Sequence, residues 1–194
     1  MNLIFATHNQ HKAKELKAIL PEGYSLQSLT ELGMHEDIPE TGTTLEENAL
    51  IKARYLYQHK GEACFADDTG LEVEALDGAP GVYSARYAGE EADAAANIQK
   101  LLEALGEKLD RQARFRTVIA YIDERGQEHL FEGVVKGRIT ITEQGSDGFG
   151  YDPVFQPEGY HQTFAQMSAS EKNEISHRGK AVRQFIRFLR DQKS

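Results

Sequence analysis

Asn2-Leu-Ile-Phe-Ala-Thr-His-Asn-Gln-His-Lys12 is the segment that decides the class of fold. Its first five residues form an apolar run with the length of a buried strand. Beyond it, apolar residues recur at helical spacing from Ala13 to Leu20, and the pattern ends at Pro21-Glu-Gly23. The chain is therefore expected to open with a strand, a polar loop and a helix.

Helices and strands alternate along the rest of the chain. Helical spacing predicts three more helices, at Thr44–Gln58, Ala92–Leu105 and Ser176–Arg190. Apolar or alternating runs predict four more strands, at Ala63–Ala66, Leu71–Leu76, Phe115–Ile122 and Glu128–Thr142. This order predicts an α/β fold whose mixed sheet is flanked by helices. No segment has the composition of a linker, so residues 1–194 are expected to form one domain.

The composition disfavours several classes of function. With 31 acidic and 22 basic side chains the formal net charge is −9, whereas a protein that coats nucleic acid needs a basic surface. The single cysteine, Cys64, excludes an internal disulfide framework and fits a reducing compartment. No apolar run approaches the roughly 18 residues of a membrane span, and the first apolar run is too short for a signal peptide. A cytoplasmic protein without nucleic-acid or membrane partners is expected.

The loop Thr7-His-Asn-Gln-His-Lys12 is a candidate phosphate site. A loop between a strand and a helix N-terminus presents free backbone N–H groups and the positive end of the helix dipole to an anion. Thr7 and Asn9 add short hydrogen-bonding side chains, and Lys12 adds a positive charge. The spacing of a Walker loop is absent. The alternative is that Asn9 only caps the helix and that Lys12 is solvated.

Two acidic segments could hold a divalent cation. The adjacent carboxylates of Asp67-Asp68 repel each other, and a cation would relieve that repulsion. Successive strand residues point to opposite faces, so one aspartate is expected to face the site. The alternative for Asp67-Asp68-Thr69-Gly70 is a hairpin turn. Glu47 is explained by the capping box Thr44-x-x-Glu47, whereas Glu40 has no such role and is a candidate ligand of Mg²⁺.

Two later segments carry groups that could bind a nucleobase. The glycine-rich segment Gly145–Pro153 contains Phe149 and Tyr151, and its glycines would allow a planar base to approach an aromatic ring. A strand-entry loop with packed aromatics is the alternative. At Ser176-His-Arg178, two basic residues begin a helix, where cations oppose the helix dipole. An anionic or carbonyl-bearing ligand would explain them, and so would a salt bridge to an acidic side chain.

Taken in order, these segments resemble the inosine triphosphate pyrophosphatase family, whose bacterial members are also called dITP/XTP pyrophosphatases. Six blocks between residues 6 and 179 carry the resemblance: Ala6–Lys12, Glu40–Gly42 with Glu47–Ala49, Phe65–Leu71, Gly78–Gly89, Gly148–Phe155, and Glu171–Lys172 with Ile175–Gly179. The second position of the family's first loop is often Gly and is His8 here. The residue after the aspartate pair is often Ser and is Thr69 here. Neither departure is expected to abolish activity.

The resemblance implies an elongated α/β structure with two lobes around a long mixed sheet and a nucleotide-binding cleft between them. It also implies a homodimeric, Mg²⁺-dependent enzyme. Such an enzyme hydrolyses deaminated purine triphosphates (ITP, dITP and XTP) to the monophosphate and pyrophosphate, and so cleanses the nucleotide pool. Glu40 and Asp68 would hold Mg²⁺, and Asp68 would also act as general base. Substrate contacts are implied at Thr7, His8, Asn9, Gln10, His11, Lys12, Thr69, Phe149, Gly150, Tyr151, Asp152, Lys172, His177 and Arg178.

The chemistry of the implied reaction agrees with these assignments. Water attacking phosphorus needs a base, and charge building on the phosphate oxygens needs cations. Arg178 only donates hydrogen bonds, so it would pair with the 6-oxo group of hypoxanthine or xanthine and would face an amino donor in adenine. Two other functions stay open: a Maf-type pyrophosphatase that prefers other modified bases, and a regulatory module that binds nucleotides without turnover.

Overall fold

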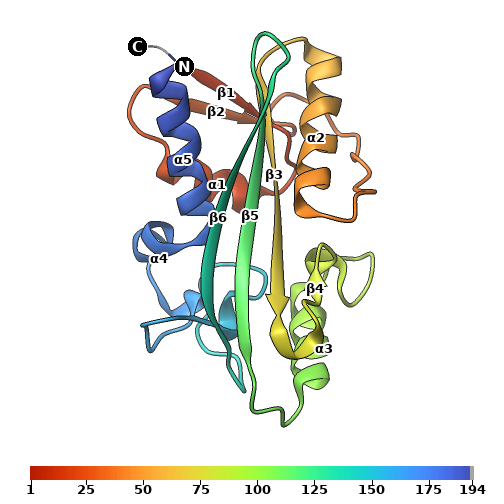
Figure 1. Ribbon diagram of the computed structural model, residues 1–194, viewed down its shortest axis with the longest axis vertical. Helices are drawn as coiled ribbons and strands as arrows, with labels where there is room; N and C mark the ends of the chain where they lie inside the picture. The colour runs from red at the N-terminus through yellow and green to blue at the C-terminus, as the bar shows by residue number, and fades with distance from the viewer. Residues whose placement is uncertain (193–194) are drawn as a thin grey trace. The chain divides into compact units, whose positions relative to one another are not determined.

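Strands of one mixed sheet and flanking helices make up the computed structural model, which describes residues 1–192 (Figure 1). The strands are β1 (Asn2–Phe5), β2 (Ser25–Ser28), β3 (Cys64–Val73), β4 (Pro80–Gly81), β5 (Gln112–Ile122), β6 (Glu128–Ile139) and β7 (Phe155–Pro157). The α-helices are α1 (Gln10–Ile19), α2 (Leu45–Lys60), α3 (Ala94–Leu105), α4 (Ala169–Ile175) and α5 (His177–Asp191). None of these helices has the length and apolar character of a membrane span. The predicted α/β class with a mixed sheet is confirmed.

The strand order of the sheet is β2-β1-β3-β5-β6-β7, with β4 paired to β3. β1 pairs in parallel with β2 and β3, whereas β4 pairs antiparallel with β3 and β7 pairs antiparallel with β6. In the parallel pairs Leu3 lies opposite Leu26, and Phe5 lies opposite Phe65. Strands that are covered on both faces are expected to be continuously apolar, which explains the run that opens the chain.

The chain divides into two compact units, which we describe separately. Unit 1 comprises Met1–Asp68, Thr117–Gly133 and, among the described residues, 178–192. Unit 2 comprises Thr69–Arg116 and Val134–His177. The chain crosses between the units inside β3 (Asp68 to Thr69), inside β5 (Arg116 to Thr117), inside β6 (Gly133 to Val134) and at the start of α5 (His177 to Arg178).

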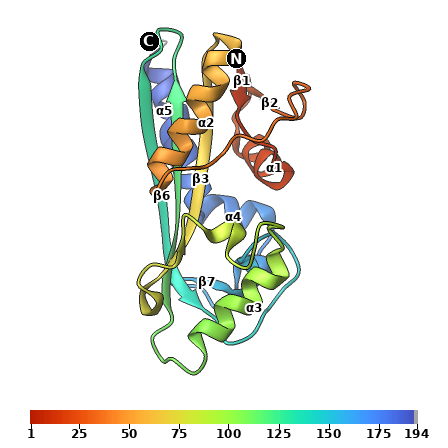
Figure 2. The same ribbon diagram turned by 90° about the vertical axis from the view of Figure 1, so that its right-hand side faces the viewer.

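The core of unit 1 lies between its strands and the helices α1 and α5. Figures 1 and 2 show α2 on one side of these strands and α5 on the other. Phe5 and Phe65 stack with ring centroids 4.6 Å apart, and Phe185 of α5 packs against Phe65 at 5.1 Å. The buried members of this core are Leu3, Phe5, Ala13, Leu16, Leu26, Phe65, Ile119, Tyr121, Ala181, Val182, Phe185, Ile186 and Leu189.

Unit 2 has a core of its own, in which α3 packs through its apolar stripe of Ile98, Leu101 and Leu105. Asp93 caps the start of α3 by accepting a hydrogen bond from Ala96 N–H, and Gly106 caps its end. The other buried members are Leu71, Val73, Ala113, Phe115, Val135, Ile139, Tyr151, Val154, Phe155, Phe164 and Met167.

The main difference from the sequence-based expectation lies in β3. The two strands predicted at Ala63–Ala66 and Leu71–Leu76 are one strand, Cys64–Val73, followed by a 3₁₀ turn at Glu74–Leu76. The alternative of a hairpin turn at Asp67–Gly70 is therefore wrong. Asp67–Gly70 favour a turn locally but lie inside β3. Lys12, Arg178 and Lys52 balance the charge of Asp67 there.

Several short elements were not predicted from the sequence, among them β2, β4, β7 and α4. β2 buries only alternate residues of a four-residue segment, which is too short for a clear periodic signal. α4 begins at a capping box in which Ser168 and Glu171 bond each other's backbone N–H groups. The sequence Ser168-x-x-Glu171 carries that signal, but the seven-residue helix is too short for an apolar stripe. The last helix begins at His177, and Ser176 is the C-cap of α4.

Candidate active site

The loop between β1 and α1 is held by its own side chains. Thr7 Oγ1 accepts a hydrogen bond from Asn9 N–H (3.1 Å), and Asn9 Oδ1 accepts one from Lys12 N–H (3.1 Å). Asn9 is therefore the N-cap of α1. Gln10 and His11 are exposed in the first helical turn. The loop presents a helix N-terminus, which is the arrangement that favours a phosphate group.

Lys12 is not a solvated lysine, so that part of the simpler alternative is wrong. Its Nζ lies 3.0 Å from Asp67 Oδ1, and Arg178 Nε lies 3.5 Å from the other carboxylate oxygen. Burial alone would raise the pKa of Asp67, but Lys12, Arg178 and Lys52 together lower it to about 2. Asp67 is therefore ionised, and it holds two cations in place.

Lys52 of α2 joins the two residues that were predicted as metal ligands. Its Nζ lies 3.4 Å from Glu40 Oε1 and 3.6 Å from Asp68 Oδ1. Burial would lower the pKa of Lys52, but Asp68, Glu40 and Asp67 raise it, so the ammonium group stays charged. The carboxylates of Glu40 and Asp68 thus share one cation.

Lys52 is not among the residues predicted for the site, although the sequence carries a signal for it. Helix α2 buries Leu45, Ala49, Ala53 and Leu56, and Lys52 is buried with them. A lysine is almost never fully buried unless it is paired. A lysine among the core-facing positions of an amphipathic helix therefore indicates an acidic partner elsewhere in the chain.

Asp68 combines burial with an oxygen that lacks a partner. Burial raises its pKa to about 6, and Glu40 and Asp67 act in the same direction. Lys52 and Lys12 oppose this rise without cancelling it. Within residues 1–192, the Oδ2 atom of Asp68 is buried and has no hydrogen-bond partner. Such atoms are uncommon in folded proteins, and a buried carboxyl with a perturbed pKa is typical of a functional site.

Glu40 and Asp68 fit a hard divalent cation. Mg²⁺ takes one or two carboxylates together with substrate phosphates and water. The unpartnered Asp68 oxygen and the Lys52 cation between the two carboxylates indicate that positive charge is favoured there. Among the described residues, no cluster of three or more His, Cys, Asp or Glu side chains could hold a metal ion.

Arg178 is buried among carboxylates. Its guanidinium donates a hydrogen bond to Glu15 Oε2 and faces Asp67, and its side chain is only 2% exposed. The salt bridge, which was one of the two alternatives for this position, is present. Glu15 lies on α1, and nothing in the sequence links it to a partner 163 positions away.

In unit 2, Asp152 fastens the glycine-rich segment. Its Oδ2 accepts hydrogen bonds from Phe149 N–H (3.0 Å) and from Lys172 Nζ (2.6 Å). A Cβ atom at Gly148 would lie 2.2 Å from the same oxygen, so glycine is required there. Lys172 Nζ also lies 4.9 Å from the centre of the Phe149 ring. The structure therefore brings together three of the residues predicted to bind substrate.

The other predicted residues of unit 2 lie in different surroundings. His177 is buried, and its ring stacks on Phe115 with centroids 4.6 Å apart. Thr69 is partly exposed within β3 and follows Asp68 directly in the chain. Gly150 adopts a φ of +60°, a conformation that glycine tolerates best. Contact of these three residues with substrate stays a prediction.

Tyr151 packs into the core of unit 2. Its hydroxyl donates a hydrogen bond to the backbone carbonyl of Ser84 (2.6 Å), and burial raises the pKa of this hydroxyl. The alternative of a packed aromatic therefore applies to the Tyr151 side chain. A substrate contact at this position would have to come from its backbone.

Tyr151→Phe is expected to destabilise the protein without slowing catalysis. The buried Ser84 carbonyl would lose its donor from Tyr151, which costs roughly 1–3 kcal/mol. Urea unfolding measures the stability, and kcat/KM for the implied triphosphate substrates measures the activity. The exposed Tyr160 of the same unit supplies a matched control, Tyr160→Phe. A tenfold fall in kcat/KM at unchanged stability would show that the hydroxyl serves the substrate instead.

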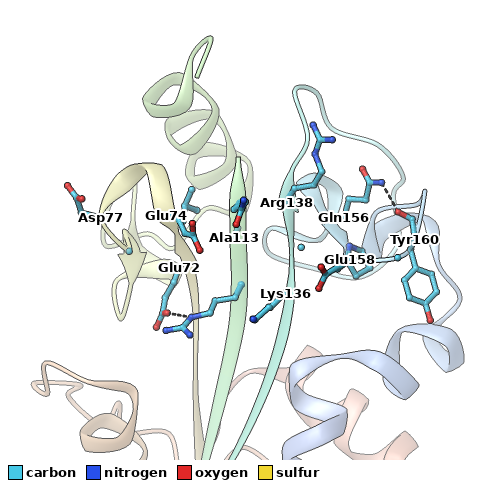
Figure 3. A pocket seen from close by; sticks show the side chains of 16 residues that line it. Glu72, Glu74, Asp77, Ala113, Lys136, Arg138, Gln156, Glu158 and Tyr160 are labelled. Carbon is cyan, nitrogen blue, oxygen red and sulfur yellow. Dashed lines mark hydrogen bonds and ion pairs between the residues drawn. The ribbon is translucent and has the colours of Figure 1, made fainter. Parts of the chain in front are cut away.

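Unit 2 also contains a pocket of about 850 Å³ that is separate from these residues (Figure 3). Its charged lining residues are Glu72, Glu74, Asp77, Glu158, Arg114, Lys136 and Arg138. Acidic and basic groups are mixed there, and Arg114 is already paired with Glu72 at 2.6 Å. None of the predicted site residues lines this pocket. It lacks the positive field that attracts a triphosphate, so we exclude it from the candidate site.

Comparison with known proteins assigns the chain to a family. The sequence model of the Ham1 family matches residues 3–188. The Staphylococcus aureus Ham1 protein is 41% identical in sequence and has a TM-score of 0.89, with 99% of this chain and 100% of that chain covered. The chain belongs to the Ham1 family.

Relatives of this chain carry a more specific name. A protein of Flavobacterium psychrophilum is 53% identical over 98% of this chain and all of the relative, and is named dITP/XTP pyrophosphatase. A Porphyromonas gingivalis protein of the same name is 56% identical over 96% of each chain. A Mycobacterium abscessus structure titled nucleoside-triphosphatase and dITP/XTP pyrophosphatase is 43% identical, with a TM-score of 0.77 and coverage of 95% and 98%.

Proposed function

We propose that this chain is a Mg²⁺-dependent pyrophosphatase that hydrolyses deaminated purine nucleoside triphosphates (ITP, dITP and XTP) to the monophosphate and pyrophosphate. The observation that carries the proposal is the buried Asp68, whose pKa is raised to about 6 and whose Oδ2 has no hydrogen-bond partner within residues 1–192. Relatives named dITP/XTP pyrophosphatase, at 53% and 56% identity over nearly the whole chain, support the choice of substrate.

Unit 1 would supply the hydrolytic chemistry. Asp68 would accept a proton from water as the water oxygen attacks the α-phosphorus. The bond between the α-phosphorus and the bridging oxygen would break, and pyrophosphate would leave with the electron pair. Lys12, Lys52 and the N–H groups at the start of α1 would stabilise the negative charge that builds on the phosphate oxygens.

Glu40 and Asp68 would hold Mg²⁺. A divalent cation bound there supplies positive charge to the phosphate oxygens as the reaction proceeds. Lys52 already shows that a cation is favoured beside both carboxylates. Mg²⁺ is positive and the triphosphate is negative, and both would bind at the same place. We therefore expect each to strengthen the binding of the other.

Unit 2 would supply contacts to the nucleotide from Lys172, Asp152 and Phe149. Asp152 and the Phe149 backbone are already held by hydrogen bonds, so the Phe149 ring is presented in a fixed position. The cation of Lys172 would suit a phosphate or an oxo group. His177 of unit 2 and Arg178 of unit 1 would donate hydrogen bonds to the purine. Arg178 is held by Glu15 and Asp67, which would fix the direction of its donors.

The proposal extends to the assembly and the cellular location. We propose that residues 1–194 act as a single catalytic domain, that the enzyme is a homodimer, and that it works in the cytoplasm. A homodimer predicts a solution mass of about twice 21.7 kDa, which light scattering after size-exclusion chromatography measures. A monomeric mass at micromolar concentration would exclude the dimer.

The test of the proposed function is a product assay on a panel of nucleotides. The enzyme is expected to release pyrophosphate, not orthophosphate, from ITP, dITP and XTP in the presence of Mg²⁺. We expect kcat/KM for ATP to be at least about 100-fold lower, because its 6-amino donor would face Arg178 and leave a buried donor unpaired. Preference for a modified pyrimidine triphosphate would favour the Maf-type alternative. Tight binding of ITP without any hydrolysis would leave only the regulatory alternative.

A further inference from the structure

The segment of residues 34–42 carries Glu40 and has no regular secondary structure. Its two ends are fastened. Met34 N–H donates to the carbonyl of Leu29 (2.9 Å), and Gly42 N–H donates to Asn48 Oδ1 (2.8 Å). A Cβ atom at Gly42 would lie 2.6 Å from Glu47 Cβ, so the chain runs tightly against the start of α2 there. Glu40 lies between these two ends, so its position depends on further contacts made by residues 35–41.

Glu36 provides this hold through two contacts. Its backbone carbonyl is 2.9 Å from His8 Nε2, and its carboxylate Oε2 accepts a hydrogen bond from Tyr55 Oη (2.6 Å). A carbonyl oxygen can only accept, so Nε2 of His8 carries the hydrogen. Within residues 1–192, residues 35–41 form hydrogen bonds and ion pairs only through Glu36 and Glu40.

The two partners of Glu36 belong to elements that already carry site residues. His8 lies in the loop between β1 and α1, beside Thr7 and Lys12. Tyr55 lies on α2, three positions after Lys52 and therefore on a neighbouring part of the same helical face. Glu36 thus ties the Glu40 segment both to the candidate phosphate loop and to the helix whose lysine contacts Glu40 and Asp68.

We propose that His8, Glu36 and Tyr55 form a latch that positions Glu40 opposite Asp68 and so sets the affinity of the site for Mg²⁺. The inference rests on the proposed function, because it concerns the metal pair of that site. His8 and Tyr55 act here as positioning residues, since each contacts Glu36 of the loop; substrate contact of His8 stays a separate prediction. A glycine at position 8, which is frequent in the resembling family, could not make the His8 contact.

The latch is expected to lower the entropy cost of Mg²⁺ binding. A loop that is free between its ends samples many positions, and ordering it costs conformational entropy when the metal binds. If Glu36 orders the loop beforehand, that cost is removed from the binding step. Loss of the latch should therefore weaken Mg²⁺ binding and leave the reaction at saturating Mg²⁺ nearly unchanged.

Tyr55→Phe is the most direct test. The change removes the hydroxyl and keeps the ring that packs on His59, with centroids 4.1 Å apart. We expect the Mg²⁺ concentration for half-maximal pyrophosphate release to rise about threefold to tenfold, as for the loss of one ordinary, solvent-exposed hydrogen bond. We expect kcat at saturating Mg²⁺ to stay within about twofold. Tyr57→Phe, on the same helix, is the matched control and should change neither quantity.

Two readouts do not depend on activity. Hydrogen–deuterium exchange of the metal-free protein should be faster in residues 34–42 of Tyr55→Phe than in wild type or Tyr57→Phe. Isothermal titration with Mg²⁺, in the presence of a non-hydrolysable ITP analogue, should give a dissociation constant raised by the same factor as the kinetic one. Glu36→Ala should behave like Tyr55→Phe, and the double variant should be no worse than Glu36→Ala alone, because both changes remove the same bond.

The outcomes separate the latch from the proposed function. If wild type hydrolyses no purine triphosphate at any Mg²⁺ concentration, the proposed function fails, whereas exchange of residues 34–42 and Mg²⁺ titration still decide the latch. If wild type is Mg²⁺-dependent and Tyr55→Phe has the wild-type Mg²⁺ requirement, the latch is overturned. It is also overturned if Tyr57→Phe raises the Mg²⁺ requirement as much as Tyr55→Phe does.

Discussion

Asp68→Asn is expected to lower kcat for ITP hydrolysis by about 10³-fold or more while changing the affinity for ITP by less than about tenfold. Asparagine has the shape of aspartate, but it cannot accept the proton of the attacking water, and general bases contribute roughly 10²–10⁴-fold to rates. Loss of one of the two proposed Mg²⁺ ligands would add to the effect. Pyrophosphate release measures kcat, and calorimetric titration with ITP measures the affinity.

The free energy of unfolding of Asp68→Asn shows whether a loss of activity comes from the missing base or from a loss of folding. Because burial raises the pKa of Asp68 from 3.8 to about 6, the carboxyl is still mostly ionised at neutral pH, but its ionisation destabilises the folded protein relative to the unfolded chain. Replacing it by a neutral side chain should not lower the free energy of unfolding, and Lys52 keeps Glu40 as a partner. Asp147→Asn, at an exposed position, is a matched control. An Asp68→Asn variant with more than a tenth of wild-type kcat would contradict the role of Asp68 as general base.

The sequence predicted the main parts of this site because its motifs carry chemistry that is local. The strand, polar loop and helix at the N-terminus were placed correctly, and Asn9 caps α1, as the alternative for this loop proposed. The structure also places Lys12, Asp68 and Arg178, which the resemblance implies as site residues, in one neighbourhood. Lys12 and Arg178 contact Asp67, the neighbour of Asp68, and Lys12 acts on the pKa of Asp68.

The remaining features depend on pairings over long distances in sequence. Periodicity marks Lys52 as a buried position, but it cannot identify Glu40 and Asp68 as its partners. Glu15 looks like an ordinary helical surface residue until α5 brings Arg178 against it. The turn alternative at Asp67–Gly70 failed for the same reason, since local preferences of Asp and Gly were outweighed by cations from three other elements.

Adjacent aspartates should therefore respond in opposite ways to the same substitution. Asp67→Asn is expected to lower the free energy of unfolding by about 3–5 kcal/mol, because it leaves Lys12 and Arg178 buried without their shared carboxylate. For a chain of this length each kcal/mol shifts Tm by roughly 2–4 °C, so Tm should fall by about 10 °C. Guanidinium unfolding and calorimetry measure both quantities, again with Asp147→Asn as the control.

The pH dependence of this difference tests its electrostatic origin. Lys12, Arg178 and Lys52 lower the pKa of Asp67 from 3.8 to about 2 against the effect of burial. A carboxyl whose pKa is lower in the folded than in the unfolded state stabilises the fold above pH 3.8, and this contribution disappears as the pH falls through 2. The gap in stability between wild type and Asp67→Asn should thus be constant above pH 5 and shrink below pH 4. A gap that stays constant down to pH 2 would mean that Asp67 acts through packing and hydrogen bonding alone, and that its charge does not hold Lys12 and Arg178.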